Sequence, residues 1–125
     1  MKRYLVLAEG HSADPHHGKT MRGFVRYGPH PTVAIVDSAR AGESYEGIPI
    51  VARVNDALCY APTTALIGVA PTGGVLPPVW RDLLRTCIGK GIDIESGMHA
   101  YLSDDAELSD LARRHGVALR DLRRP

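Results

Sequence analysis

The sequence predicts a three-layer α/β sandwich built around a mostly parallel sheet of five or six strands. Short, nearly continuous apolar runs recur along the 125-residue chain, and most are followed by a segment with helical periodicity. Such strands are typical of a parallel sheet that is covered on both faces. Each run breaks into a turn of small or polar residues, and in a parallel sheet these turns share one edge. We therefore expect one Rossmann-like domain, residues 1–125, with its ligand site along that edge.

Four apolar runs carry the prediction of the sheet. They are residues 4–8, 32–36, 65–69 and 92–95, and residues 117–122 supply a last strand that exits to solvent at Asp121. The run at 47–51 contains Pro49, which cannot donate a backbone hydrogen bond, so we expect a short or edge strand there. The turns after the four main runs, at residues 9–12, 37–42, 70–74 and 96–99, are expected to line one crevice.

Helical segments separate these strands. They are expected at about residues 19–27, 55–60, 77–91 and 103–116. The third is the clearest, because two prolines open it, apolar residues recur at helical spacing and Gly91 closes it. The fourth is expected to begin at Ser103 or Asp104, since Asp104 and Glu107 have the spacing of a capping box.

Composition and charge argue against several classes of protein. The formal net charge is only +1, whereas nucleic-acid binders usually carry a strong basic excess, so we expect no nucleic-acid partner. No apolar run has the length of a membrane span or the pattern of a secretory signal. Two cysteines without a paired motif fit a reducing compartment, so we expect a cytoplasmic protein. The arginines from Arg113 onward, Arg120 among them, are interpreted as a solvated helix face and a frayed terminus.

The first turn has the spacing of a phosphate-binding P-loop. Gly18, Lys19 and Thr20 end the segment, but Ala13 stands where the first glycine of a P-loop belongs and Pro15 removes a backbone donor. A working nucleoside-triphosphatase loop is therefore disfavoured. Two alternatives remain open: a helix start that offers its N–H groups and the Lys19 ammonium to an anion, or a capped helix with that lysine in solvent.

Asp37 ends the second strand, near the position where dinucleotide-binding folds place a carboxylate on a ribose hydroxyl. Arg40 could instead meet a phosphate through two hydrogen bonds. The Gly-x-Gly-x-x-Gly fingerprint is missing, since Gly10 has no partner at the required spacing, so standard binding of NAD or NADP is disfavoured. The alternative is an aspartate that caps a turn.

The other turns add the remaining candidate ligand-binding residues. They are Glu9 and Gly10 after the first strand, Pro71, Gly73 and Gly74 in a turn that lets backbone approach a ligand, and Ser96, Gly97 and His99 after the fourth main strand. His99 has no visible partner, so it is either an acid–base group or a hydrogen-bonded structural residue. The histidines at 11, 16 and 17 lack the spacing of a metal site, and no nucleophile elbow is present, so we expect neither a metal nor a catalytic residue.

Several motifs together resemble a known family. They are Gly18-Lys19-Thr20, Asp37-Ser38 with Ala41-Gly42, residues 47–51, Ala70-Pro71-Thr72-Gly73-Gly74 with residues 75–80, and Ser96-Gly97-Met98-His99 with residues 100–105. This order resembles the N-terminal domain of an uncharacterised two-domain family that includes D-glutamate N-acetyltransferases and whose second domain is P-loop-like. The resemblance extends over essentially the whole chain. Residues 47–50 and the helix after them are also loosely similar to the CoA-binding domains of succinyl-CoA ligases.

The resemblance implies a Rossmann-like module that works with a P-loop partner domain, although the sequence stops where that domain would begin. We expect it to bind a phosphate- or carboxylate-bearing small molecule, with acetyl-CoA or a nucleotide as the candidate cofactor, and to form a homo-oligomer or pair with the partner domain. The alternative is a structural or dimerisation domain with no ligand of its own. The chain is not expected to be catalytic alone, although the resemblance implies part of an N-acetyltransferase.

Overall fold

A computed structural model describes residues 2–10, 12, 23, 25, 30–67, 76–97 and 101–122. Within these residues, seven strands form one sheet in the order β3-β4-β2-β1-β5-β6-β7. The strands are β1 (Tyr4–Leu7), β2 (Thr32–Val36), β3 (Ser44–Tyr45), β4 (Ile48–Val51), β5 (Thr64–Ile67), β6 (Asp93–Ser96) and β7 (Leu119–Asp121). All neighbours pair in parallel except β3 and β4. The Rossmann-like α/β prediction is confirmed, although the sheet has more strands than the five or six expected.

The parallel strands have the order of a dinucleotide-binding fold. Numbered by themselves along the chain, the six parallel strands follow the order 3-2-1-4-5-6, with β3 added at one edge as an antiparallel strand. The strand with Pro49 is short, as expected, but it is not at the edge, because Tyr45 pairs with Ile48 and covers its outer side. The direction of the connections reverses between β1 and β5, which is where ligands of such folds bind.

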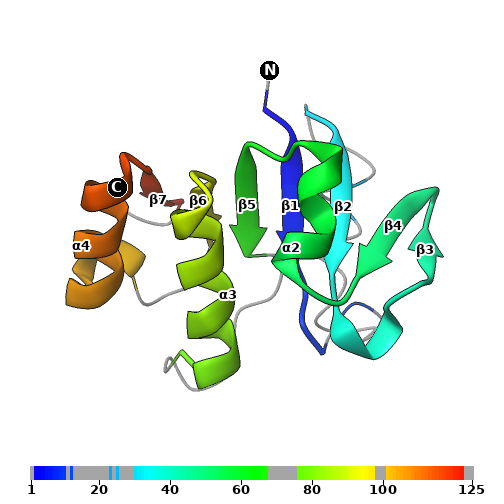
Figure 1. Cartoon of the computed structure of the whole chain (residues 1–125), viewed down its shortest axis with the longest axis horizontal. Coiled ribbons are helices and arrows are strands. Elements are labelled where there is room, and N and C mark those ends of the chain that lie inside the picture. Colours follow the sequence, from blue (N-terminus) through cyan, green and yellow to red (C-terminus); the bar gives the residue numbers. More distant parts are fainter. Residues whose placement is uncertain are drawn as a thin grey trace.

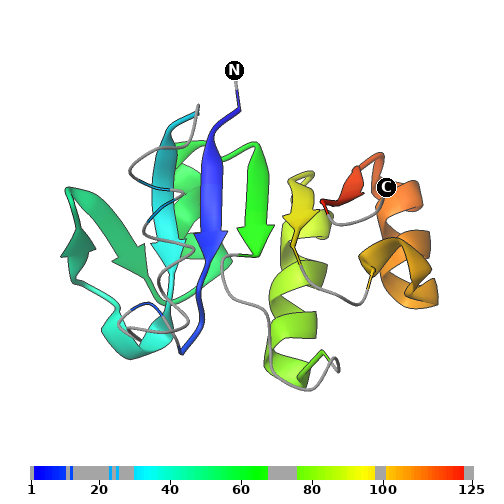
Figure 2. The same ribbon diagram turned by 180° about the vertical axis from the view of Figure 1, so that it is seen from behind.

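Three helices pack on one face of the sheet (Figures 1 and 2). They are α2 (Val54–Ala57), which continues as a 3₁₀ turn over Leu58–Tyr60, α3 (Pro78–Gly89) and α4 (Ala106–His115). Alternate residues of the central strands, such as Leu5, Leu7 and Ile94, are fully buried against Trp80, Leu84 and other residues of these helices. Among the described residues, this layer holds most of the buried apolar side chains, and burial of each large one stabilises the fold by about 1.5–3 kcal/mol.

The opposite face of the sheet holds a smaller apolar cluster and a buried carboxylate. Val6, Ala8, Ile35 and Ile50 form the cluster. Beyond it, the Glu95 carboxylate is 5% exposed and accepts hydrogen bonds from Tyr4 Oη at 2.7 Å and Lys2 Nζ at 2.6 Å. Burial by itself would raise the pKa of Glu95, but these hydrogen bonds hold it below its usual value. The carboxylate is therefore a charged link between β1 and β6.

Arg120 contributes to the same cluster, which differs from the expectation that it lies on a solvated helix face. It belongs to β7, and its Nη1 lies 3.6 Å from Asp93 Oδ2 and 3.7 Å from Glu95 Oε2. Because β7 pairs with β6, the arginine is placed directly across from Glu95 in the register. The arginines of α4, in contrast, are exposed as expected.

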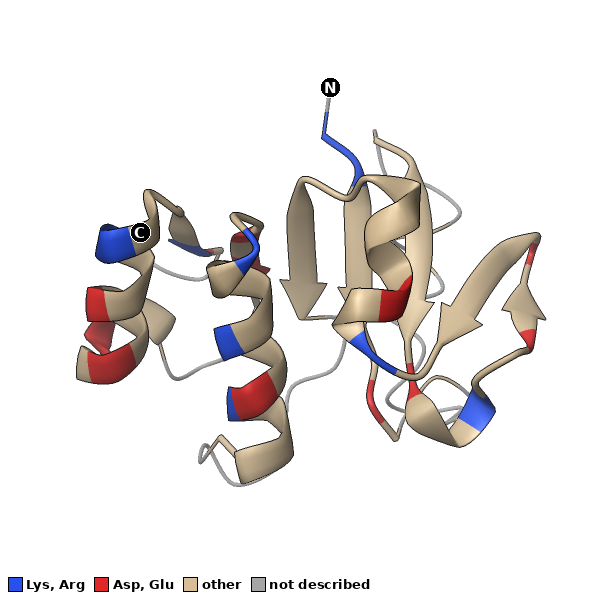
Figure 3. Ribbon diagram, viewed as in Figure 1, with Lys and Arg blue, Asp and Glu red and all other residues tan. Residues whose placement is uncertain are grey.

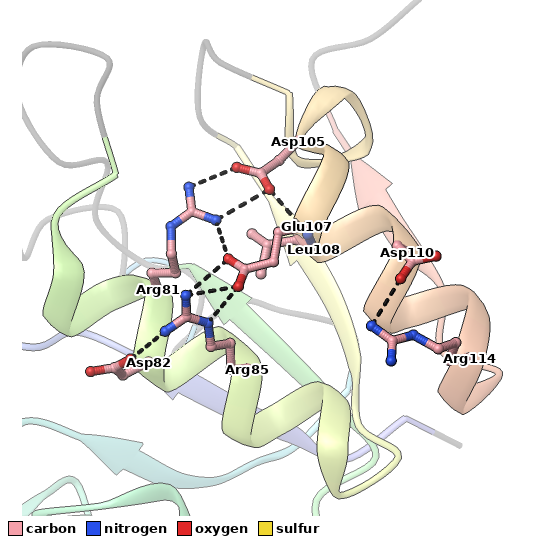
Figure 4. Close-up of polar contacts among 8 residues, drawn as sticks. All are labelled: Arg81, Asp82, Arg85, Asp105, Glu107, Leu108, Asp110 and Arg114. Atoms are coloured by element: carbon pink, nitrogen blue, oxygen red, sulfur yellow. Dashed lines mark hydrogen bonds and ion pairs between the residues drawn. The ribbon is translucent and has the colours of Figure 1, made fainter.

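Ion pairs join α3 to α4 (Figure 4). Arg81 donates to both oxygens of Asp105, at 3.2 and 2.7 Å, and also to Glu107 at 2.9 Å. Asp105 accepts a hydrogen bond from the backbone N–H of Leu108 as well, which makes it the N-cap of α4. The cap is therefore one residue later than the Asp104 expected from sequence, because a 3₁₀ turn over Leu102–Asp104 precedes the helix.

Replacing Asp105 with alanine is expected to lower the free energy of unfolding by about 2 kcal/mol. Loss of an N-cap costs about 1 kcal/mol, and the two hydrogen bonds from Arg81 are lost with it. Urea denaturation measures the change. Asp82→Ala, which removes a mostly exposed carboxylate of α3, is the control and should change the value by less than about 0.5 kcal/mol. Equal effects of the two substitutions would show that Asp105 has no capping role.

Candidate functional site

The carboxyl edge of the sheet brings together several of the predicted site residues. Because β1, β2, β5 and β6 are parallel, the turns that follow them start at the same edge. Acidic residues lie just beyond the ends of β1 and β2 at this edge (Figure 3). The predicted residues described there are Glu9, Gly10, Asp37, Arg40, Ser96 and Gly97. Gly18, Lys19, Thr20, Pro71, Gly73, Gly74 and His99 lie outside the described residues.

Asp37 holds the first turn of the domain. Its carboxylate accepts hydrogen bonds from the backbone N–H groups of Gly10 and Ser12, each at 3.0 Å, and from the Ser12 hydroxyl. It also accepts from the N–H of Ala39 at 3.1 Å and so caps the 3₁₀ turn Ser38–Arg40. Gly10 has a φ of +78°, a conformation that favours glycine. The carboxylate therefore fixes the path of the chain after β1 from the end of β2.

This arrangement bears on the expected role of Asp37 at a ribose. The residue is only 1% exposed, and both carboxylate oxygens have partners within the chain. Burial by itself would raise the pKa of Asp37, but the hydrogen bonds from Ser12, Gly10 and Ala39 lower it below its usual value. The contacts of Asp37 within the chain are thus those of an aspartate that caps a turn. The predicted contact between Asp37 and a ligand stays a prediction.

Glu9 and Arg40 are the more accessible charged groups of the two turns. Glu9 accepts from the backbone N–H of Ser38 at 2.8 Å and from the Ser38 hydroxyl. Arg40 donates to the Ser12 hydroxyl at 3.3 Å and pairs with Glu43 at 3.3 Å. The turns after β1 and β2 are therefore joined three times, through Asp37, Glu9 and Arg40.

A cavity of about 310 Å³, the edge hollow, opens beside these turns. Its apolar wall consists of Ala52, Val54, Val79 and Leu83. Its polar lining consists of Glu9, Ser38, Arg53, Asn55, Asp82 and Thr86. The lining thus comes from the ends of β1 and β2, from the start of α2 after β4, and from α3. Sequence reasoning found Glu9 but missed the contribution of α3, because only the fold brings that helix beside the first two turns.

The other half of the edge carries Ser96 and Gly97 and is held by a second aspartate. Asp121, in β7, accepts from the N–H groups of Leu102 and Ser103, at 2.7 and 3.1 Å, and from the Ser103 hydroxyl at 2.6 Å. It was expected only to mark an exit to solvent, but it anchors the segment after β6. Three strand spacings separate β2 from β6, so the edge offers a site about 14 Å long.

The described residues include neither an activated buried thiol nor a cluster of metal ligands. Cys87 is buried, and desolvation raises its pKa to about 12, so its thiol is not an activated nucleophile. Among the described residues, no group of three or more His, Cys, Asp or Glu side chains is arranged to hold a metal ion. Nor does any described helix combine the length and the apolar character required to span a membrane.

Comparison with known proteins supplies the family. Residues 33–125 match the family described as "Domain of unknown function (DUF1611_N) Rossmann-like domain". The chain belongs to this family. A DUF1611 family protein from Anabaena variabilis has a crystal structure that matches 99% of the chain with a TM-score of 0.89 and 31% identity, and the match covers 38% of that protein. The family resemblance inferred from the sequence motifs is thereby confirmed.

This DUF1611_N chain is also similar in sequence to two curated proteins and in fold to a dehydrogenase. D-glutamate N-acetyltransferases from Pseudoalteromonas sp. and Tritonibacter scottomollicae are each 37% identical over 62 residues, which is 50% of this chain and 19% of those proteins. Homoserine dehydrogenase from S. aureus matches 97% of the chain and 32% of its own with a TM-score of 0.56 and 16% identity, which shows a shared fold. The chain thus spans about a fifth to two fifths of the length of these relatives.

Proposed function

We propose that this DUF1611_N domain binds a nucleotide-type small molecule that bears a phosphate or carboxylate, along the carboxyl edge of its sheet. The observation that carries the proposal is the position of the edge hollow. It lies outside the carboxyl ends of β1 and β2, in a sheet with the strand order of dinucleotide-binding folds. Ligands of open α/β sheets bind in the crevice at this edge, near the point where the strand order reverses.

The size and lining of the edge hollow support this proposal. Small-molecule sites usually enclose about 300–1,000 Å³ and combine an apolar wall with a few polar groups that orient the ligand. The hollow has about 310 Å³, an apolar wall that includes Val79, and polar groups from Glu9, Ser38 and Asn55. Val79 is 50% exposed at the start of α3, so its side chain offers apolar surface to a ligand in the hollow.

The anionic part of the ligand is proposed to lie next to the hollow, at the reversal between β1 and β5. Backbone N–H groups at helix starts and glycine-rich turns bind anions without a basic cluster. In the sequence, Gly73 and Gly74 come after β5, and Gly18, Lys19 and Thr20 come after the first turn, so these residues are the proposed donors. Arg40, the cation of the second turn, is a further proposed donor to the anion.

The relatives suggest where this binding belongs. Because D-glutamate N-acetyltransferases share part of this sequence and are longer than this chain, we propose that the domain supplies one side of a site completed by a P-loop partner domain or a second copy. Acetyl-CoA and D-glutamate are then candidate ligands beside ATP and NAD. In this proposal the domain alone is a cytoplasmic binding module and does not transfer acetyl groups by itself.

One observation favours a second candidate, a purely structural domain. The carboxylates of Asp37 and Asp121 both hold backbone turns and Glu9 binds Ser38, so several polar groups of the edge already stabilise the fold. A domain whose turns only support a catalytic partner would need nothing more. Binding experiments on the chain separate the two candidates.

At least one of CoA, acetyl-CoA, ATP, NAD, NADP and D-glutamate is expected to raise the melting temperature. A ligand that binds only the folded state at a hundred times its Kd adds about 2.7 kcal/mol of stability. Differential scanning fluorimetry measures the shift. Val79→Trp, which fills the edge hollow from α3, should abolish it, whereas Lys90→Trp at the other end of that helix should not. If none of the six compounds shifts the melting temperature, the structural candidate is favoured.

A further inference from the structure

We infer that the edge hollow takes the adenosine part of the ligand with its ribose hydroxyls free of phosphate, and that Glu9 accepts their hydrogen bonds. The inference rests on the proposed function and makes it specific. The nucleotide candidates named above share adenosine, but CoA carries a phosphate on the 3′-hydroxyl of its ribose and NADP one on the 2′-hydroxyl, whereas ATP and NAD leave both hydroxyls free. The site should therefore prefer ligands of the ATP or NAD type.

Asp37 is not free to play this part. The fold places the ribose carboxylate of dinucleotide sites at the end of the second strand, where Asp37 stands. Its two oxygens already accept from Gly10, Ser12 and Ala39, and the side chain is buried. A hydroxyl could reach it only if the first turn gave up one of these bonds.

Glu9 can take its place, because it lines the hollow and keeps part of its hydrogen-bonding capacity. An ionised carboxylate has about four acceptor positions on its two oxygens. Ser38 uses one position on each oxygen, through its N–H at 2.8 Å and through its hydroxyl. Both oxygens are thus held in orientation by one neighbour and can accept further bonds. Two adjacent hydroxyl donors, as on a ribose, match the two oxygens of one carboxylate.

The charges of the described lining disfavour a phosphate on the 2′ or 3′ oxygen of this ribose. Two of the described lining residues, Glu9 and Asp82, are negatively charged. Arg53 is the one cation among the described lining residues. That arginine pairs with Asp56 at 3.2 Å. Helix α2 has only four residues and provides no N-terminal anion site of its own. A phosphate beside Glu9 would therefore meet like charge, while the apolar wall of Val54, Val79 and Leu83 suits a base.

Calorimetry with four small probes tests the inference on the unmodified chain. The probes are AMP, 2′-deoxy-AMP, adenosine 2′,5′-bisphosphate and adenosine 3′,5′-bisphosphate. AMP is expected to bind at least tenfold more tightly than each of the other three. Glu9→Gln removes the negative charge and should bring both bisphosphates within about threefold of AMP. Glu43→Gln, a carboxylate of the same edge that does not line the edge hollow, should leave the tenfold preference unchanged.

The possible results distinguish this inference from the proposed function. Equal binding of AMP and the bisphosphates would overturn the inference and leave the proposed function standing. So would tight binding of the bisphosphates that is lost in Arg53→Gln, because the arginine would then recognise phosphate. If no adenosine probe binds but D-glutamate raises the melting temperature, the inference fails and a carboxylate site remains. If nothing binds, both fail.

Discussion

Replacing Asp37 with asparagine is expected to lower the free energy of unfolding by about 2–3 kcal/mol. The substitution keeps the shape of the side chain but turns one acceptor oxygen into an amide donor. That donor would face either the N–H of Gly10 or the N–H and hydroxyl of Ser12, which now donate to the carboxylate. Leaving a buried donor without an acceptor costs about 1–3 kcal/mol, and hydrogen bonds to a charged group contribute about 1.5–3 kcal/mol. Urea denaturation at neutral pH gives the value.

The pH dependence provides an independent check on Asp37. Its pKa is lowered in the folded state, so its contribution is complete above the unfolded value of about 3.9 and is lost as the pH falls through the folded pKa. The wild-type chain should therefore lose stability more steeply in acid than Asp37→Asn does. Asp110→Asn, on the exposed side of α4, is the control and should follow the wild type. A mutant as stable as the wild type at neutral pH would show that Asp37 does not hold the turn.

The apolar pattern was sufficient to predict most of the sheet. Residues 32–36 were expected as a strand and form β2 with the same bounds, because all five are apolar or β-branched and a turn follows at once. The helix opened by Pro78 was also well predicted, since its start and its apolar stripe depend on local sequence alone. Local signals of this kind need no knowledge of which segments pack together.

Features that depend on pairing between distant segments were not predictable in the same way. β3 has only two residues and no apolar pattern, so it exists because Ser44 and Tyr45 meet Pro49 and Ile48. The same contact explains why the strand with Pro49 is not at the edge. The true cap of α4 was missed by one residue, because an extra 3₁₀ turn shifts the start of the helix to Asp105.

The candidate site shows the same division. Sequence reasoning placed Glu9, Gly10 and Asp37 at one edge, because a parallel sheet aligns the ends of its strands. The sequence could not indicate which carboxylate would have its oxygens occupied by hydrogen bonds within the chain. Those hydrogen bonds join residues 25 to 29 positions apart. In the structure Asp37 holds the first turn, and Glu9 lines the edge hollow.

Asp37 and Asp121 have the same structural role at the two halves of the edge, because each binds backbone N–H groups of a neighbouring turn. Each stands at or just after the end of a strand and accepts backbone N–H groups from the turn that follows the neighbouring strand. Backbone donors in such turns have no partner in the sheet, so a carboxylate on the next strand satisfies them. The two carboxylates therefore fix the turn after β1 and the segment after β6, at the two halves of the edge.

Replacing Glu95 with glutamine is expected to lower the free energy of unfolding by about 2–3 kcal/mol, through a contact far from the edge hollow. The carboxylate is almost fully buried and joins β1 to β6 through Tyr4 Oη and Lys2 Nζ. Removing its charge weakens hydrogen bonds that contribute about 1.5–3 kcal/mol each when one partner is ionised. Because its folded pKa is lowered, this stability is present above about pH 4.3 and is lost as the pH falls through the folded pKa.

A double-mutant cycle with Tyr4→Phe isolates one of these contacts. The Tyr4 hydroxyl donates to Glu95 at 2.7 Å, and both side chains are buried, so the two substitutions are expected to cost about 1 kcal/mol less together than the sum of their separate effects. Denaturation of the wild type, both single variants and the double variant supplies the four values. Strict additivity would mean that Glu95 stabilises the sheet through Lys2 and Arg120 alone. Because none of these residues lines the edge hollow, nucleotide affinity should be the same in every variant that remains folded.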